Sequence, residues 1–161
     1  EDSLDKLSSL THLTFGWKFN QPLKESLNNL SSLTHLTFGI DFNQSIENSL
    51  NNLTSLTHLT LCHNFNQSIE IPFNIKFLSI DYNKIDLIEN LPNNIEELNF
   101  GLYFNLELLN LPNSIKIIRF HKKSNYYKDL NNLPKQLEIL ELPKKYDKKI
   151  KNINPNCKII K

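Results

Sequence analysis

The chain has 161 residues, of which 22% are charged, and 18 Lys or Arg balance 17 Asp or Glu to a formal net charge of +1. No run of 18 apolar residues and no signal-like apolar segment is present, so we expect no membrane-spanning helix and a soluble protein. The charge is unevenly placed. Residues 1–112 carry 5 basic and 13 acidic side chains, a net of −8, and residues 113–161 carry 13 basic and 4 acidic ones, a net of +9. We therefore expect an electrical dipole along the molecule.

The chain is an array of similar units. Residues 31–53 repeat residues 8–30 with only six changes in 23 positions. Self-similarity at such a period is the mark of a solenoid, in which each unit buries its apolar face against its neighbours. We expect one solenoid domain over residues 1–161: a partial repeat over 1–7, about seven repeats over 8–156, and a capping strand over 157–161. The units begin at apolar positions 19 to 23 residues apart, namely Leu10, Leu33, Leu56, Ile75, Ile95, Ile115, Leu137 and Cys157.

Each unit predicts one short strand. Apolar residues occupy its first, fourth and sixth places, and the last two alternate across one polar residue, which is a strand pattern. Because about 17 residues join successive strands, the strands must pair in parallel. The segments between them contain Leu at spacings of three together with Pro, so loops and short 3₁₀ turns are expected there. The predicted strands are 11–15, 34–38, 57–61, 76–80, 96–100, 116–120 and 138–142, with a last one around 158–160.

A Phe-Asn pair follows most of these strands. It occurs at Phe19-Asn20, Phe42-Asn43, Phe65-Asn66 and Phe104-Asn105, with weaker matches at Ser124-Asn125 and Tyr146-Asp147. The unit that starts at Ile75 instead fits the general leucine-rich repeat pattern, with Asn83 in the asparagine place. Together with the strings FNQPL, FNQSI, LPNNIEEL and LPNSIKII, these pairs resemble the FNIP repeat, a leucine-rich repeat variant of amoebae and of the giant viruses that infect them.

The resemblance implies a right-handed leucine-rich repeat-like coil with a curved parallel β-sheet on its concave side and loops or 3₁₀ turns on its convex side. In such a coil each Phe should fill the corner after a strand. Each Asn should satisfy backbone groups of adjacent turns, which would otherwise cost about 1–3 kcal/mol apiece when buried. We therefore interpret Asn20, Asn43, Asn66 and Asn105 as an asparagine ladder that is structural.

Three histidines recur at one place in successive units, and we expect them to form a column on the open sheet face. A row of small polar and charged residues runs beside them, which makes the two columns a candidate protein-binding strip. Metal binding by the imidazoles is the alternative. We predict no metal and no cofactor, because side chains in one column lack convergent geometry and no carboxylate is expected to orient them. The strip comprises His12, Thr14, His35, Thr37, His58, Thr60, Ser79, Asn99 and Arg119, with Glu141 next in the row.

Aromatic rings follow several strands, at Trp17, His63, Tyr82 and Tyr103. They are candidate anchors for a partner, because interfaces favour aromatic hot spots. The alternative interpretation is that these rings pack against the neighbouring turn. The first unit is covered only by the partial repeat, so Leu10, Leu13 and Phe15 should be partly uncovered. Self-association through this end is therefore a further hypothesis.

The basic C-terminal third is the basis of a second hypothesis, polyanion or nucleic-acid binding. Clustered cations suit phosphates, and the interleaved Tyr126, Tyr127 and Tyr146 would suit stacked bases. The alternative is a solvated lysine-rich edge in an A/T-biased coding sequence, and we regard nucleic acid as the less favoured partner. The candidate residues are Lys122, Lys123, Lys144, Lys145, Lys148 and Lys149, within a basic set that also contains Lys116, Arg119 and Lys151.

Catalytic motifs such as HExxH, GxSxG and a phosphate-binding loop are missing, and the only three glycines, Gly16, Gly39 and Gly101, share one repeat position. We therefore predict a non-enzymatic protein–protein interaction module with an unknown protein partner. The FNIP resemblance implies a finer role, since such repeats are sometimes coupled to an F-box that recruits a ubiquitin ligase. No F-box-like segment lies in these residues.

The two cysteines, Cys62 and Cys157, fall about five units apart, or roughly 24 Å at 4.8 Å per strand. A disulfide needs α-carbons within about 7 Å, so none is expected. Two unpaired thiols favour a reducing, intracellular setting, which would be the host cytoplasm if the protein is viral.

Overall fold

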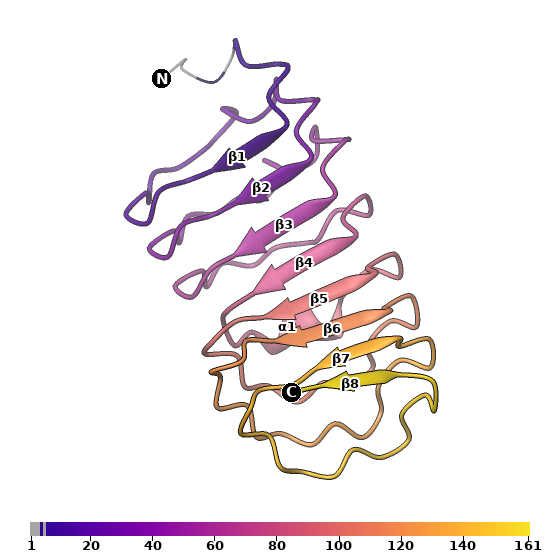
Figure 1. The fold of residues 1–161 in the computed structure, drawn as a ribbon. Helices are drawn as coiled ribbons and strands as arrows, with labels where there is room; N and C mark the ends of the chain where they lie inside the picture. Colours follow the sequence, from indigo (N-terminus) through magenta and orange to yellow (C-terminus); the bar gives the residue numbers. More distant parts are fainter. Residues whose placement is uncertain (1–3, 5) are drawn as a thin grey trace.

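The computed structural model describes residues 4 and 6–161, so residues 1–3 and 5 of the predicted partial repeat lie outside the described part. Eight strands form one parallel sheet in chain order (Figure 1). Every predicted strand is confirmed with its ends within one or two residues, and the fold is the predicted repeat solenoid. The strands are β1 His12–Thr14, β2 His35–Thr37, β3 His58–Leu61, β4 Phe77–Ile80, β5 Glu97–Phe100, β6 Ile117–Phe120, β7 Ile139–Glu141 and β8 Lys158–Ile160.

The register puts equivalent residues of neighbouring units side by side. His12 pairs with His35, His35 with His58, and His58 with Phe77. The middle residue of each strand points into the core, where Leu36, Leu59 and Leu78 are buried. The residues on either side of it lie on the side of the sheet that faces away from the core, which we call the open face.

The return segments behind the sheet consist of loops and tight turns, as expected. Their turns are closed by bonds from an N–H to the carbonyl three residues earlier, such as Ser26 to Leu23 and Ser49 to Ile46, which is the 3₁₀ spacing. In the fourth unit this segment also contains a single turn of α-helix, α1 Ile85–Glu89, which buries Leu87 and Ile88 (Figure 1).

The asparagine ladder is confirmed at the corners for Asn20, Asn43 and Asn105, and it is wrong for Asn66, whose side chain makes no hydrogen bond among the described residues. Asn20 Oδ1 accepts the backbone N–H of Asn43 at 2.9 Å, and Asn43 Oδ1 accepts that of Asn66 at 2.8 Å. The ladder resumes from Asn83 Oδ1 to Asn105 N–H at 2.7 Å. Between its two parts, Lys84 Nζ donates to the Asn66 carbonyl at 3.3 Å. The side chains therefore satisfy N–H groups that have no partner in the sheet.

Phenylalanine fills the same corner, as predicted. Phe42, Phe65 and Phe104 are fully buried, and the ring centroids of Phe42 and Phe65 lie 6.2 Å apart in nearly parallel planes. The exit turn, between the strand and this corner, is held close to its neighbour. A Cβ at Gly39 would lie 2.1 Å from the Gly16 carbonyl oxygen, so glycine is required there for a steric reason.

In two units the turn between the strand and the corner differs in length from that of the other units. The residues that fill these two corners therefore differ from the predicted ones. In the fourth unit Tyr82 is the corner residue, two positions after Ile80, and it packs edge-on against Phe65 at 5.6 Å. In the sixth unit Tyr126 is the corner residue, six positions after Phe120. Tyr126 stacks on Phe104 at 6.2 Å, so the expected match at Ser124-Asn125 is wrong. A serine is too small to fill the space beside Phe104.

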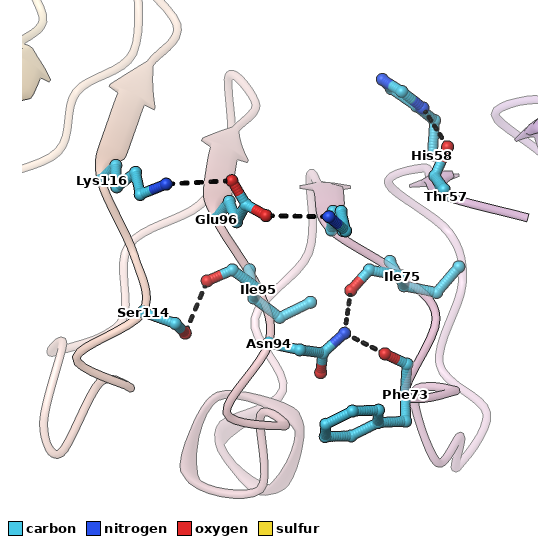
Figure 2. Close-up of polar contacts among 10 residues, drawn as sticks. Thr57, His58, Phe73, Ile75, Asn94, Ile95, Glu96, Ser114 and Lys116 are labelled. Carbon is cyan, nitrogen blue, oxygen red and sulfur yellow. Dashed lines mark hydrogen bonds and ion pairs between the residues drawn. The ribbon is translucent and has the colours of Figure 1, made fainter.

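A second polar column lies where each unit enters the sheet, and the sequence patterns did not single it out. Asn94 Nδ2 donates to the carbonyls of Phe73 and Ile75, the latter at 2.7 Å, and Ser114 Oγ donates to the Ile95 carbonyl at 2.7 Å (Figure 2). Asn74 acts in the same way on the carbonyls of Leu53 and Leu56. The fifth and sixth units are therefore tied to their predecessors at both ends of their strands.

The ladder predicts unequal effects for two residues of one column. Asn43→Ala removes the acceptor of both Asn66 N–H and Gln67 Nε2, so we expect the free energy of unfolding to fall by about 1–3 kcal/mol. Asn66→Ala is the matched control: in the part of the chain that the structure describes, its side chain makes no hydrogen bond, and we expect a change within about 0.5 kcal/mol. Urea unfolding measures both. Equal losses would contradict the ladder.

The corner tyrosines give a second contrast. Among the described residues the buried hydroxyl of Tyr126 has no hydrogen-bond partner, whereas that of Tyr146 donates to the Lys128 carbonyl at 3.2 Å. Tyr126→Phe should therefore raise the free energy of unfolding by about 1 kcal/mol, and Tyr146→Phe should lower it by about the same amount. Thermal unfolding of the two variants distinguishes these signs. A loss of stability in Tyr126→Phe would show that its hydroxyl is satisfied.

Candidate binding surface on the open sheet face

The first column of the open face is a stack of four aromatic rings. His12 and His35 have ring centroids 4.0 Å apart, His35 and His58 are 3.8 Å apart, and Phe77 continues the stack 4.0 Å from His58. The planes of these neighbours lie within 16° of parallel. The parallel register of β1 to β4 produces the stack, because it pairs the first residues of neighbouring strands with one another.

A threonine before each histidine fixes its ring. Thr34 Oγ1 donates to the Thr11 carbonyl at 2.9 Å and lies 2.8 Å from His35 Nδ1. Since the hydroxyl proton is already used, Nδ1 is the donor in that second bond and Nε2 of the neutral ring keeps its lone pair. Thr57 holds His58 in the same way, at 2.8 Å (Figure 2). Sequence reasoning missed these threonines, although the recurrence of Thr-His in three units was a usable signal.

Stacking and partial burial change the acidity of the column. Burial and the neighbouring His12 lower the pKa of His35. Burial and then His35 lower the pKa of His58, while Glu97 acts in the opposite direction. The fold therefore favours the uncharged imidazole at His35 and His58, next to the hydroxyls of the threonine row.

The second half of the open face is charged, but its charges are paired within the protein. The Arg119 guanidinium pairs with Glu97 through Nη1, and its Nε lies 3.3 Å from Glu141 Oε2. Asn99 Nδ2 donates to Glu97 Oε1 at 2.9 Å. Arg119 and Asn99 thus lie in the predicted row, yet their polar groups already have partners inside the sheet.

A second charged row runs along the strand starts. Glu96 forms ion pairs with Lys76 at 3.1 Å and with Lys116 at 3.3 Å (Figure 2). Hydrogen bonds from these two lysines lower the pKa of the Glu96 carboxyl. Charge in this half is therefore arranged as cross-strand pairs of opposite sign.

The comparisons with known proteins agree with this architecture. Residues 82–123 match the family described as FNIP Repeat. This segment of the chain is similar to an FNIP repeat. A solved structure of CroV588, a protein from the giant virus CroV described as a novel circular leucine-rich repeat protein, is 31% identical with a TM-score of 0.68. The match covers 93% of this chain and 28% of that one, so the chain spans little more than a quarter of its length. No curated protein matches.

The aromatic residues on the exit turns are only partly available to a partner. Trp17 and Tyr103 have 76% and 55% of their surface exposed, and the exposed His63 ring lies 4.2 Å from that of Tyr103. Tyr82, in contrast, is 6% exposed at the corner. Its prediction as an anchor is wrong, because the shorter turn of the fourth unit draws it into the core.

The basic residues separate into two groups. Lys148 pairs with Asp129 at 2.8 Å, and Lys149 follows it, whereas the other four candidates lie on two neighbouring exit turns. Tyr126 and Tyr146 are 3% exposed, so the expectation that they stack on bases is wrong. Tyr127 is 58% exposed, with Lys128 Nζ 5.0 Å from its ring centroid. The lysines on the exit turns are Lys122, Lys123, Lys144 and Lys145.

The described residues contain no group of three or more His, Cys, Asp or Glu that could hold a metal ion. Cys62 and Cys157 are free thiols. Within the same part of the chain no helix is long and apolar enough to cross a bilayer.

The histidine stack predicts a loss of stability in mild acid. The lowered pKa values of His35 and His58 leave stability complete above the unfolded histidine pKa of about 6.5 and reduce it as the pH falls through the folded values. We expect the urea midpoint to drop between pH 7.5 and 5. The drop should shrink in a His35→Gln/His58→Gln variant and persist in the control His121→Gln, outside the stack. An unchanged drop in the double variant would contradict the prediction.

Proposed function

We propose that the protein is a non-enzymatic module that binds another protein through the first half of the open face. FNIP repeats on a leucine-rich repeat-like fold mark a repeat protein, a class that usually mediates protein interactions. The observation that supports this site best is the row of Thr14, Thr37 and Thr60 beside the histidine stack, on three strands paired in parallel register.

The two halves of the open face differ in what they offer a partner. In the first half, the Nε2 lone pairs of His35 and His58 are turned away from the threonines that hold Nδ1. In the second half, Arg119 makes ion pairs with both Glu97 and Glu141, so a partner would have to break these bonds to use the three side chains. Ser79, Asn99 and Arg119 then form the border of the binding strip, and its centre lies at β1 to β3.

The identity of the partner is a finer proposal. The FNIP resemblance supports a role in holding a substrate for a ubiquitin ligase, with ligase components as partners. The free thiols Cys62 and Cys157 support a reducing, intracellular compartment, which is the host cytoplasm if the protein is viral. Self-association through the first unit also stays a prediction: Leu10, Leu13 and Phe15 are only partly buried, and the mass of the protein in solution tests it.

Affinity capture from amoebal lysate tests the proposed strip. The bait Thr37→Arg/Thr60→Arg places two long cations over the strip, and we expect it to retain about tenfold less of the specific partner than the unchanged protein, which corresponds to about 1.4 kcal/mol. Thr54→Arg/Asn51→Arg is the matched control, because both residues are exposed on a return segment. Partners retained equally by all three baits would contradict a site on the open face. A partner set without ligase components would remove the finer proposal alone.

A further inference from the structure

The exit turns of β6 and β7 bring four exposed lysines together on neighbouring units. Lys122 and Lys123 lie on the first turn, and Lys144 and Lys145 lie on the second. The Lys144 N–H donates to the Lys122 carbonyl at 3.2 Å, so the two turns stack directly. They lie on the edge of the solenoid toward which the strand arrows point (Figure 1). With neighbouring strands about 4.8 Å apart, the four side chains share a small area.

The fold does not require lysine at these positions. The equivalent exit turns of the first, second and fifth units carry Trp17-Lys18, Ile40-Asp41 and Leu102-Tyr103. The sixth unit has a longer turn, because six positions separate Phe120 from Tyr126 where four separate Phe38 from Phe42. The extra length belongs to the turn that presents Lys122 and Lys123. The lysine pairs are therefore a feature of these two units rather than of the repeat.

These lysines also differ from the four cations that make ion pairs within the described part of the chain. Lys76 and Lys116 share Glu96, Arg119 lies between two glutamates, and Lys148 pairs with Asp129. Within the described part of the chain, none of the four exit-turn lysines makes an ion pair. A bound anion would therefore pair with charges that have no acidic partner in the protein.

His121, at the start of the longer turn, adds a hydrogen-bond donor. The Lys123 N–H donates to His121 Nδ1 at 3.3 Å, so the neutral ring carries its proton on Nε2. The ring is exposed. Four ammonium groups and one imidazole N–H suit an acceptor with several anionic oxygens, and phosphate is the common group of that kind.

The surroundings favour a compact anion over an extended one. A nucleic acid that followed this edge toward β1 would leave the basic third and pass over residues 1–112, which carry a net charge of −8. The corner rings Tyr126 and Tyr146 are buried and offer no face for bases. We propose that Lys122, Lys123, Lys144 and Lys145 form a site for a compact ligand that bears two or more phosphate groups. The source is either a soluble polyphosphorylated molecule or the headgroup of a multiply phosphorylated lipid.

Calorimetric titration of the whole chain with tripolyphosphate at low ionic strength tests the site. We expect binding that weakens steeply with added salt. The variant Lys122→Gln/Lys123→Gln/Lys144→Gln/Lys145→Gln should bind at least about tenfold more weakly. The control Lys135→Gln/Lys149→Gln/Lys151→Gln/Lys158→Gln removes the same charge from other exposed positions of the basic third and should keep most of the affinity. Circular dichroism establishes that both variants are folded.

Two results would overturn the proposal: no binding by the unchanged chain, or equal losses in the two variants, which would show that only net charge matters. A single-stranded RNA that binds more tightly than tripolyphosphate through the same four lysines would overturn the assignment of a compact ligand. Vesicles with a multiply phosphorylated lipid distinguish the two sources. Retention that depends on the four lysines assigns the lipid headgroup, and binding of tripolyphosphate without retention on vesicles assigns a soluble ligand.

Discussion

The hydrogen bond from the backbone N–H of one corner to the asparagine amide oxygen of the preceding corner is the contact on which the rest of the coil depends. Where the chain turns out of the sheet, its N–H groups lose their strand partners, and burial without a new acceptor is costly. Asn20 and Asn43 supply that acceptor to the following unit. The phenylalanine before each asparagine can then lie flat on its neighbour, which sets the corner and therefore the direction in which the next segment leaves.

Periodicity was sufficient to predict the strands, the inward and outward faces and the ladder, because these follow from the spacing of apolar and polar residues alone. It failed at Tyr82 and Tyr126, where the expected spacing gave way to the need for a ring of sufficient volume next to Phe65 and Phe104. The hydrogen bond between Thr34 and His35 could not be predicted from the sequence, for a different reason. Its direction depends on a carbonyl 23 residues away, which accepts the threonine proton.

The charge asymmetry of the sequence has a different meaning on each surface. On the open face, cross-strand pairs such as Glu97 with Arg119 cancel it locally. On the exit edge, Lys122 and Lys144 are stacked without compensation, so the positive potential of the C-terminal third emerges there. A long-range dipole and locally paired charges on the sheet are thus compatible, because the four unpaired exit-turn lysines lie on turns rather than on strands.

The near identity of residues 8–30 and 31–53 has a consequence for how such a protein can change. Several contacts that the second unit makes with the first are made again by the third with the second, among them the histidine stacking and the bonds to the asparagine oxygens. A whole unit of 23 residues could therefore be gained or lost here without leaving a mismatched surface. The units around Tyr82 and Tyr126 have no such freedom, because their odd turns fit only the neighbours they have. The number of units can thus vary in the N-terminal part of the molecule, whereas the order of the units is fixed in the C-terminal part.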